Sequence, residues 1–508
     1  MTSRGVDAAV EHEVKLGAWP GFRLPDLDGI APWVRAAVSS DRELSATYYD
    51  APDLRLVRAG ITIRHRTGEG GATGKWTAKI PVPGSGGEER TEVTVDAGPE
   101  KVPPGVAAVL RGALRQGDLE PVARLVTRRH LVELRDGGGR KLGEVCDDEV
   151  SVLEGERVAA RFREVEVEVV PGAPPALIPL VVDHLRGAGA DEPDTTPKLV
   201  RALGPRALAP PDPPVPNLGK DPSAALVVRA AIASSVQRLL AHDPVVRLDA
   251  GEVGVHQARV STRRLRSDLK TFAPLVDQAW ADSLRADLKG LADALGRVRD
   301  ADVLGSRLEK AAADLDRVDA PHATRLVRRL GRQRAMAQAD LIELLDSAEY
   351  LALLERLVEA GRNPQLTEAA EAPAAKVLPE LVSVPWRKLR RDAGRLGRHP
   401  SDEELHQLRI RAKRARYAAE AAARALPAAA PHASTIADLQ GVLGDQHDAV
   451  VAEEWLRGAV GTGTSRQQAF VAGLLVTAER KAAAAERQRW QTAWKAASRR
   501  KVAGWLRS

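Results

Sequence analysis

The sequence predicts an α+β protein of several domains, with a β-rich N-terminal part, a proline-rich linker and an all-helical C-terminal part. In residues 1–205, short runs of alternating polar and apolar side chains are separated by Gly, Pro and Asp, which is typical of β-strands and turns. In residues 221–508, apolar side chains recur at intervals of three and four, which is typical of helices. Residues 206–220 are rich in proline and have no periodicity, which indicates a stiff spacer.

The composition is that of a globular chain. With 508 residues and 44% hydrophobic content, about three domains are expected. The net charge is only +6, so any cationic surface must be local. The single cysteine, Cys146, excludes an internal disulfide, and we interpret it as a small buried strand residue. No signal-peptide core and no uncharged apolar run of about 18 residues occurs, so we expect a cytoplasmic protein without membrane contact.

Several strands of the N-terminal part have one charged and one apolar face. In EHEVK at 11–15, Glu11, Glu13 and Lys15 share a face, because successive side chains in a strand point to opposite sides. Acids gather on the first and last strands, and bases on the strands between them. A solvated polar face explains any single strand, but it does not explain this sorting. If the charged faces point into a closed barrel, they form a tunnel with carboxylates at one wall and cations around the rest.

Such a tunnel suits a metal-bound polyphosphate. Carboxylates hold hard divalent ions such as Mg²⁺ or Mn²⁺ through oxygen, and Arg and Lys neutralise phosphate oxygens. For Lys15 there is a simpler alternative, because a lysine beside two glutamates can merely neutralise them.

Several motifs of this part occur in the order that is typical of one family. EHEVK at 11–15, AGITIRHR at 59–66, TRR at 127–129 and REVEVEV at 163–169 resemble the CYTH family of triphosphate tunnel enzymes. The resemblance implies an eight-stranded antiparallel tunnel that hydrolyses a triphosphate compound or, in one branch, cyclises ATP. It implies that five acids bind metal: Glu11, Glu13, Asp148, Glu166 and Glu168. It implies phosphate contacts from seven bases: Lys15, Arg64, Arg66, Lys79, Arg90, Arg129 in preference to Arg128, and Lys198. Glu11, Glu13 and Lys15 are the expected catalytic residues.

The stretch from His256 to Lys270 predicts a helix with one cationic face. Five of its residues fall within an arc of roughly 80° in helical projection, namely His256, Arg259, Arg263, Arg266 and Lys270. The same order of residue types, including Arg264, recurs 150 positions later in His406, Arg409, Lys413, Arg414 and Arg416. An echo follows each copy, with Leu295-Gly296 and Arg299 after the first and Leu443-Gly444 and His447 after the second. The C-terminal part is therefore predicted to be a duplicated helical unit.

The cationic faces indicate a polyanionic ligand. A solvated helix face usually mixes signs to avoid repulsion between neighbours, yet the only acid between His256 and Lys270 is Asp268, and none lies between His406 and Arg416. A plain solvated face is the alternative. A nucleic acid is a second alternative, but aromatic platforms for stacking bases are missing near these stretches, apart from Tyr417.

The helical part resembles the CHAD family over about residues 220–508. The resemblance implies two pseudo-symmetric helical bundles, about 221–360 and 370–508, with a cationic cleft that binds inorganic polyphosphate. The implied contacts are the two sets above together with Arg299: His256, Arg259, Arg263, Arg264, Arg266, Lys270, His406, Arg409, Lys413, Arg414 and Arg416. The second copy departs from the first, because His447 replaces Arg299 and Glu420 stands where Lys270 would be. The histidines can instead be helix caps or packed rings.

These patterns predict eight or so helices, with breaks at five prolines: Pro244, Pro321, Pro364, Pro400 and Pro427. The functional hypothesis is a metal-dependent triphosphatase, with Mg²⁺ or Mn²⁺, joined to a polyphosphate-binding domain that can place it on polyphosphate granules in the cytoplasm. Three alternatives stay open: a non-catalytic polyphosphate-binding protein, a nucleoside triphosphatase and an adenylate cyclase.

Overall fold

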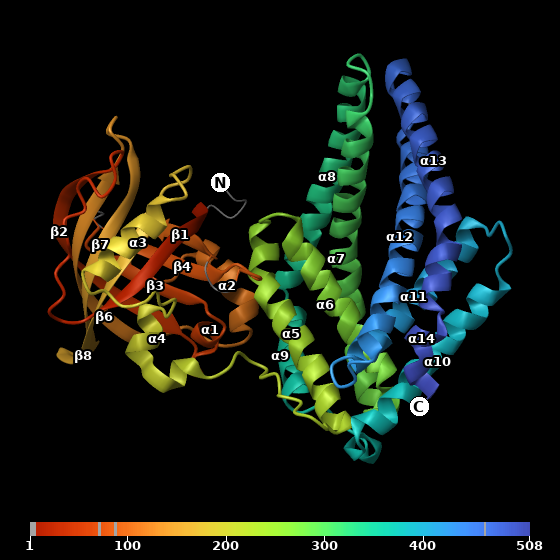
Figure 1. Ribbon diagram of the computed structural model, residues 1–508, viewed down its shortest axis with the longest axis horizontal. Helices are drawn as coiled ribbons and strands as arrows, with labels where there is room; N and C mark the ends of the chain where they lie inside the picture. Colours follow the sequence, from red (N-terminus) through yellow and green to blue (C-terminus); the bar gives the residue numbers. More distant parts are fainter. Residues whose placement is uncertain (1–6, 70–72, 86–88, 462–463, 508) are drawn as a thin grey trace. The chain divides into compact units, whose positions relative to one another are not determined.

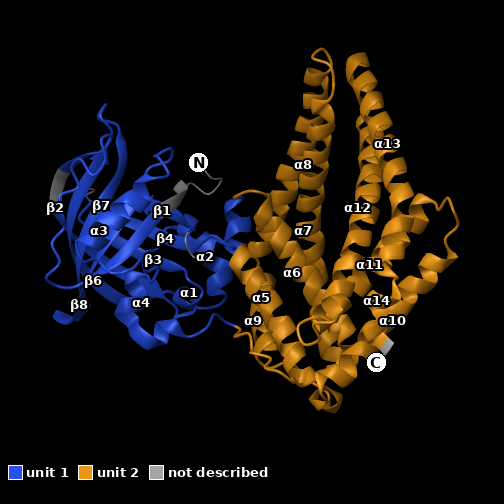
Figure 2. Cartoon of the chain, viewed as in Figure 1, with its two compact units in different colours: residues 1–212, 243–249 blue, residues 213–242, 250–508 orange. Residues whose placement is uncertain are grey.

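The computed structural model describes residues 7–69, 73–85, 89–461 and 464–507, and for 7–12, 38–40 and 507 it describes the backbone alone. The chain packs into two units, shown in Figures 1 and 2. The first contains residues 1–212 and 243–249, and the second contains residues 213–242 and 250–508. The predicted combination of a β-barrel with an all-helical part is confirmed.

The first unit is a closed antiparallel barrel of eight strands in the order β1-β5-β4-β3-β2-β6-β7-β8. The strands are β1 (Asp7–Ala18), β2 (Arg35–Asp50), β3 (Thr62–Thr67), β4 (Lys75–Pro81), β5 (Glu89–Asp96), β6 (Glu120–Arg135), β7 (Lys141–Glu154) and β8 (Arg157–Val169). The first half of β1 pairs with β5 and its second half pairs with β8, so β1 closes the barrel.

The alternating strands bury their apolar faces on the outside of the barrel, under helices. Helix α2 (Pro104–Leu114) packs its Leu110 against Trp76 and other apolar residues of β3, β4 and β5. Helix α3 (Leu177–Gly187) packs its Val181 against a second cluster that contains Val165 of β8. Because apolar burial on the outside uses one face of each strand, the charged face is left to line the interior.

One end of the barrel is covered by helix α4 (Lys198–Leu203). Leu199 of this helix is fully buried against an apolar cluster that includes Tyr48, Leu125 and Val150. Lys198 is the first residue of the helix, and Pro197 precedes it. The helix thereby brings a lysine from far along the sequence to the barrel strands.

Part of the predicted linker packs with the first unit. The short helix α1 (Arg55–Arg58) contributes Arg58, which donates to the Pro210 carbonyl. Residues Gly204–Leu208 form a 3-10 helix. Asp212 is buried and lies 3.0 Å from the guanidinium of Arg115. This stretch therefore does not behave throughout as a free spacer.

The second unit consists of helices in two similar sets. The first set is α5 (Ala224–Leu248), α6 (Glu252–Thr271), α7 (Gln278–Ala313) and α8 (Ala320–Asp346), and α9 (Ala348–Arg362) follows it. The second set is α10 (Ala374–Arg395), α11 (Asp402–Ala422), α12 (Ala429–Ala459) and α13 (Arg466–Ala497), and the short α14 (Arg500–Ala503) follows it. Helices α5 and α10 begin 150 residues apart, as do α6 and α11. Each copy thus has four long helices, as predicted.

The two copies contact each other through equivalent elements. Ser223, just before α5, forms an antiparallel bridge with Pro373, just before α10. Helices α6 and α11, which carry the two cationic faces, are packed against each other. The repeat in the sequence therefore corresponds to two copies of one helical unit in the structure.

The predicted helix break at Pro244 is wrong. Helix α5 continues through Pro244 to Leu248, and Asp243 and Arg247 form a fully buried ion pair one turn apart, with 2.6 Å between Oδ1 and Nε. The other four prolines lie at or between helix ends, as predicted. Among the described residues, α5 is also the one helix long and apolar enough to cross a membrane, but 56% of its most apolar window is buried inside the protein.

Candidate functional site

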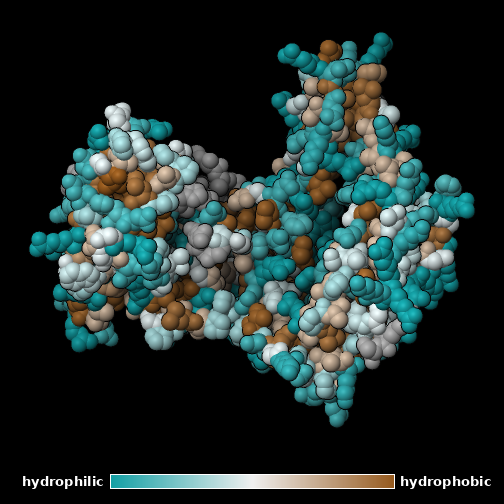
Figure 3. Space-filling model, in the orientation of Figure 1, coloured by the Kyte–Doolittle hydropathy of each residue, from teal (hydrophilic) through white to brown (hydrophobic). Residues whose placement is uncertain are grey.

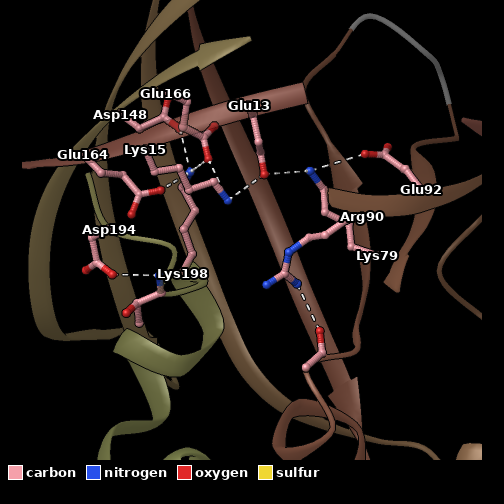
Figure 4. Close-up of polar contacts among 12 residues, drawn as sticks. Glu13, Lys15, Lys79, Arg90, Glu92, Asp148, Glu164, Glu166, Asp194 and Lys198 are labelled. Atoms are coloured by element: carbon pink, nitrogen blue, oxygen red, sulfur yellow. Dashed lines mark hydrogen bonds and ion pairs between the residues drawn. The ribbon is translucent and has the colours of Figure 1, made fainter. Parts of the chain in front are cut away.

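The second half of β1 carries a lysine between acids. Glu13 lies opposite Glu168 in register, and Lys15 lies opposite Glu166, so these four side chains share the tunnel face. The Lys15 Nζ lies 3.0 Å from Glu13 Oε1 and 3.4 Å from Glu166 Oε1 (Figure 4). Lys15 therefore neutralises acids in this structure, and its contact with phosphate stays a prediction.

Three carboxylates and two cations, Arg129 and Lys198, form a buried network beside Lys15. Figure 4 shows the three acids with Lys198. Arg129 donates from Nε and Nη2 to both oxygens of Asp148, at 2.8 and 2.7 Å, and from Nη2 to Glu166 at 2.8 Å. The Lys198 Nζ lies 3.0 Å from Asp148, 2.6 Å from Glu164 and 2.8 Å from Glu166. Asp148 and Glu164 have no exposed surface, so their charges depend on these partners.

The network also sets the pKa values of its members. Burial alone would raise the pKa of Glu166, but Lys198 and Lys15 outweigh burial and hold it well below its usual range. Burial would lower the pKa of Lys198, but Glu166 and the two other acids raise it well above its usual range. Burial raises the pKa of Glu164. Asp148 and Glu166 were expected to hold metal and Lys198 to hold phosphate, whereas the structure places all three in contact with one another.

Cations from β3, β4 and β5 line the other wall of the tunnel. The Lys79 Nζ lies 3.4 Å from Glu92 and 3.8 Å from Glu13. Arg90 donates to a backbone carbonyl at 3.0 Å, and Arg64 donates to a tyrosine hydroxyl at 3.2 Å. Lys79 of β4 therefore meets carboxylates of β1 and β5.

Three further predictions concern individual positions. Arg128 is exposed, whereas Arg129 binds acids of the network, and the contact of Arg129 with phosphate stays a prediction. Arg66 forms an ion pair with Glu69. Cys146 is buried, as expected, and burial raises the pKa of its thiol to about 12.

Two residues of the network were not among the predicted site residues. Glu164 contacts Lys198, and the Arg201 Nε lies 3.7 Å from Glu164. Arg201 also lies 2.8 Å from Asp194. Glu164 could have been found from its alternation with Glu166 in β8, whereas no pattern in the sequence identifies Arg201.

The acids near Glu13 fit a divalent ion better than the buried network does. Burial raises the pKa of Glu168, and the nearby carboxylate of Glu144 raises it further. A bound cation would offset the repulsion between these two carboxylates. Glu13 lies opposite Glu168. The side chain of Glu11 lies outside the described residues, and within those residues no group of three metal-ligating side chains is preassembled. Glu13 and Glu168, with Glu144 beside them, are therefore the oxygen donors best placed for metal.

In the second unit, both helical copies line one cavity of about 320 Å³. The first copy contributes His256, Arg259, Arg263 and Arg299, and the second contributes Arg409, Lys413 and His447. The space-filling view shows a mostly hydrophilic hollow between the α7–α8 and α12–α13 hairpins (Figure 3). Part of each cationic helix face therefore lines one shared cleft.

The cations of this cleft repel one another. Burial lowers the pKa of Lys413 to about 7, and the nearby Arg263 and Arg409 lower it as well. Burial, Arg299 and other arginines lower the pKa of His256. Asp300 and Asp448 also line the cavity, but its cations outnumber them. A bound anion would balance the excess positive charge that pushes this lysine toward its neutral form.

Other predicted polyphosphate contacts have protein partners. Arg259 lies 2.8 Å from Asp300, and Arg299 lies 2.6 Å from Glu252. His406 meets the ring of His447, with 3.2 Å between their Nδ1 atoms.

The aromatic ring of Tyr417 contacts two arginines of the cationic helix faces. Arg263 and Arg416 lie over this ring, at 5.9 and 5.0 Å from its centroid. Arg264 and Arg416 both pair with Glu420. Lys270 and Arg414 line a different cavity.

Comparison with known proteins agrees with this arrangement. Residues 22–194 match the model of the CYTH domain, and residues 230–457 match the model of the CHAD domain. The chain is a CYTH–CHAD protein. Two uncharacterized proteins from two strains of Mycobacterium tuberculosis are each 34% identical to it over 494 residues, covering 90% of both chains. Members of the CYTH family are triphosphate tunnel hydrolases or cyclases and generally use divalent metal ions.

Two solved structures are each similar to part of this CYTH–CHAD protein. PptA from Streptomyces chartreusis is 21% identical with a TM-score of 0.47, covering 54% of this chain and 99% of its own. The CHAD domain from the plant Ricinus communis is 22% identical with a TM-score of 0.46, covering 57% of this chain and 96% of its own.

Proposed function

We propose that the tunnel hydrolyses a triphosphate such as inorganic tripolyphosphate. The observation that supports this proposal is that the barrel strands bring cations, Lys79 above all, close to Glu13 and the acids beside it. A triphosphate carries several negative charges, so one wall binds its oxygens and the other holds the cation that accompanies it.

The residues of the chain have separate tasks in this proposal. Lys79, Arg64 and Arg90 bind and orient the phosphate oxygens. Lys15 lies between Glu13 and Glu166, where it can stabilise charge that develops on the phosphate. A divalent ion bound to Glu13 and Glu168 supplies further neutralisation of the phosphate oxygens. The buried network around Lys198 fixes the positions of the acids.

Phosphate release from tripolyphosphate with Mg²⁺ or Mn²⁺ tests this function. Glu13→Gln should lower the rate at least about a hundredfold, because it removes a carboxylate that faces the reacting group. Glu100→Gln, at an exposed position, is the matched control and should keep the rate. Equal and negligible release from all three proteins would contradict the proposal and favour a binding protein. Product analysis with ATP separates a nucleoside triphosphatase from a cyclase.

We also propose that the helical cleft binds inorganic polyphosphate. The unbalanced charge around Lys413 supports this, because a linear polyanion can contact both copies at once. In the full chain, affinity should rise with polyphosphate length, and Lys413→Ala should lower it about tenfold or more. Lys310→Ala, at an exposed position of α7, is the control. Stronger binding of RNA than of polyphosphate at equal salt would contradict the proposal.

We infer that this protein acts in the cytoplasm and associates with polyphosphate granules through the same cleft. A fluorescent full-length fusion should coincide with granules in cells, and the Lys413→Ala variant should be diffuse. Coincidence that is unchanged in the variant would show that another surface determines the location.

A further inference from the structure

The two copies of the helical unit differ at equivalent places. Because α5 and α10, and α6 and α11, begin 150 residues apart, equivalent positions differ by 150 in number. One group of equivalent side chains is Arg238, Arg264 and Glu420, and the other is Lys388, Arg414 and Lys270. The first group contains two cations and an acid, whereas the second contains three cations.

At the first place, the protein supplies its own anion. Glu420 pairs with both Arg264 and Arg416. Burial and Arg264 lower the pKa of Arg238, and Glu420 opposes this effect. Arg424 extends over this place and donates to Ser234 Oγ at 3.0 Å. In this copy, the Glu420 carboxylate therefore supplies the negative charge that pairs with the arginines.

At the second place, the anion is replaced by a cation and the covering side chain is replaced by a short one. Lys270 stands at the position of Glu420, Pro274 at that of Arg424, and Val384 at that of Ser234. A cavity of about 290 Å³ results.

The charge on the wall of this cavity is positive. Lys270, Lys388, Arg411 and Arg414 line it, and none of the described residues that line it is acidic. Asp392, which is not among the lining residues, binds Arg411 at 2.9 Å. Arg414 lowers the pKa of Lys270, as do burial and Lys388. These cations lack the partner that Glu420 provides in the other copy.

The other wall of the cavity is apolar. Leu381, Val384, Pro385 and Pro274 line it, and Val384 is 41% exposed. An inorganic polyphosphate would satisfy the cations but leave this wall in contact with water. Pockets of about 300 Å³ with apolar walls and a few polar groups are typical of sites for small organic molecules.

We propose that this cavity binds a small organic phosphate, with its phosphate groups on Lys270, Lys388 and Arg414 and its apolar body against Leu381, Val384 and Pro385. The phosphate takes the role that the Glu420 carboxylate has in the other copy. The site is separate from the tunnel and from the cleft around Lys413, so it does not depend on the functions proposed above.

Binding of ATP and of tripolyphosphate to the full chain, measured by calorimetry in EDTA, tests the site. ATP carries an apolar base that tripolyphosphate lacks, and both ligands also bind elsewhere, so each variant is compared with the unaltered protein. Lys270→Glu reproduces the charge of the other copy. It should lower the affinity of one ATP site at least about tenfold, so that this site no longer shows in the titration. Lys310→Glu, an equal charge change at an exposed position, should keep that site.

A second pair of variants examines each wall alone. Val384→Ser places the residue of the other copy in the apolar wall and should weaken ATP a few-fold while leaving tripolyphosphate unchanged. Arg414→Ala serves if Lys270→Glu does not fold. If Lys270→Glu and Lys310→Glu bind ATP alike, the site does not exist. If Val384→Ser has no effect and both ligands weaken equally in Lys270→Glu, the cavity is only an extension of the polyphosphate surface, which also overturns the proposal.

Discussion

The tunnel and the helical cleft both gather cations, but they treat the charge differently. In the tunnel, cations alternate with carboxylates, and Lys198 contacts three acids at 2.6 to 3.0 Å. In the cleft, Lys413 is surrounded by arginines, and its pKa falls to about 7. The acids and bases of the tunnel therefore neutralise one another. In the cleft, the cations repel one another, and a bound anion would relieve this repulsion. The same difference predicts that mutations in the buried network around Lys198 act mainly on stability, whereas those in the cleft act mainly on affinity.

The largest effect should come from Lys198→Met, which removes the cation shared by Glu164, Asp148 and Glu166. Because Glu164 and Asp148 have no exposed surface, leaving them without this partner should cost about 3–5 kcal/mol of unfolding free energy. Calorimetry of the full chain should show an earlier transition for the barrel and an unchanged one for the helical unit. Lys101→Met, at an exposed position of the same unit, should leave both transitions in place.

The pH dependence of polyphosphate binding tests the repulsion between cations in the cleft. Lys413 has a pKa of about 7 in this structure, and a bound polyphosphate should return it toward the value of an exposed lysine. Between about pH 7 and pH 10, binding should therefore take up a proton, and affinity should fall as pH rises. Calorimetry at pH 8.5 in two buffers with different ionisation enthalpies measures the uptake. The Lys413→Ala variant should lose it, and equal uptake by both proteins would exclude Lys413 as its source.

The smallest expected effect concerns the two halves of the cleft. Burial, with help from Arg409, lowers the pKa of His447 to about 4, so this residue is neutral at pH 7, whereas Arg299 of the first copy is charged. His447→Arg should raise polyphosphate affinity about three- to tenfold. Unchanged affinity would mean that the ligand does not reach the second copy here. The mutation leaves the tunnel untouched, so phosphate release should stay constant.

Much of this architecture could be predicted from sequence because it rests on periodicity. The alternation in β1 and β8 indicated which side chains share a face, and the repeat at 150 residues indicated the paired helices. Which ions pair could not be predicted. The contact of Lys198 with Glu164 depends on how α4 closes the barrel, and the pairing of Glu420 with Arg264 depends on how α6 crosses α11.

Local rules also failed where tertiary packing outweighed them. Proline usually ends or bends a helix, yet α5 continues past Pro244. The buried ion pair of Asp243 with Arg247 spans that position. Asp and Arg are usually exposed, so the sequence alone does not predict that this pair is buried.

The last turns of α5 have a practical consequence for anyone who wants the barrel alone. Leu248 belongs to the same apolar cluster as Trp76 and Leu110, and Arg247 donates to the Ala108 carbonyl at 3.2 Å. A fragment that stops at the proline-rich stretch therefore lacks a piece of its own interior, supplied by residues 243–249. Anyone dissecting the chain should graft this heptapeptide back or work with the intact polypeptide.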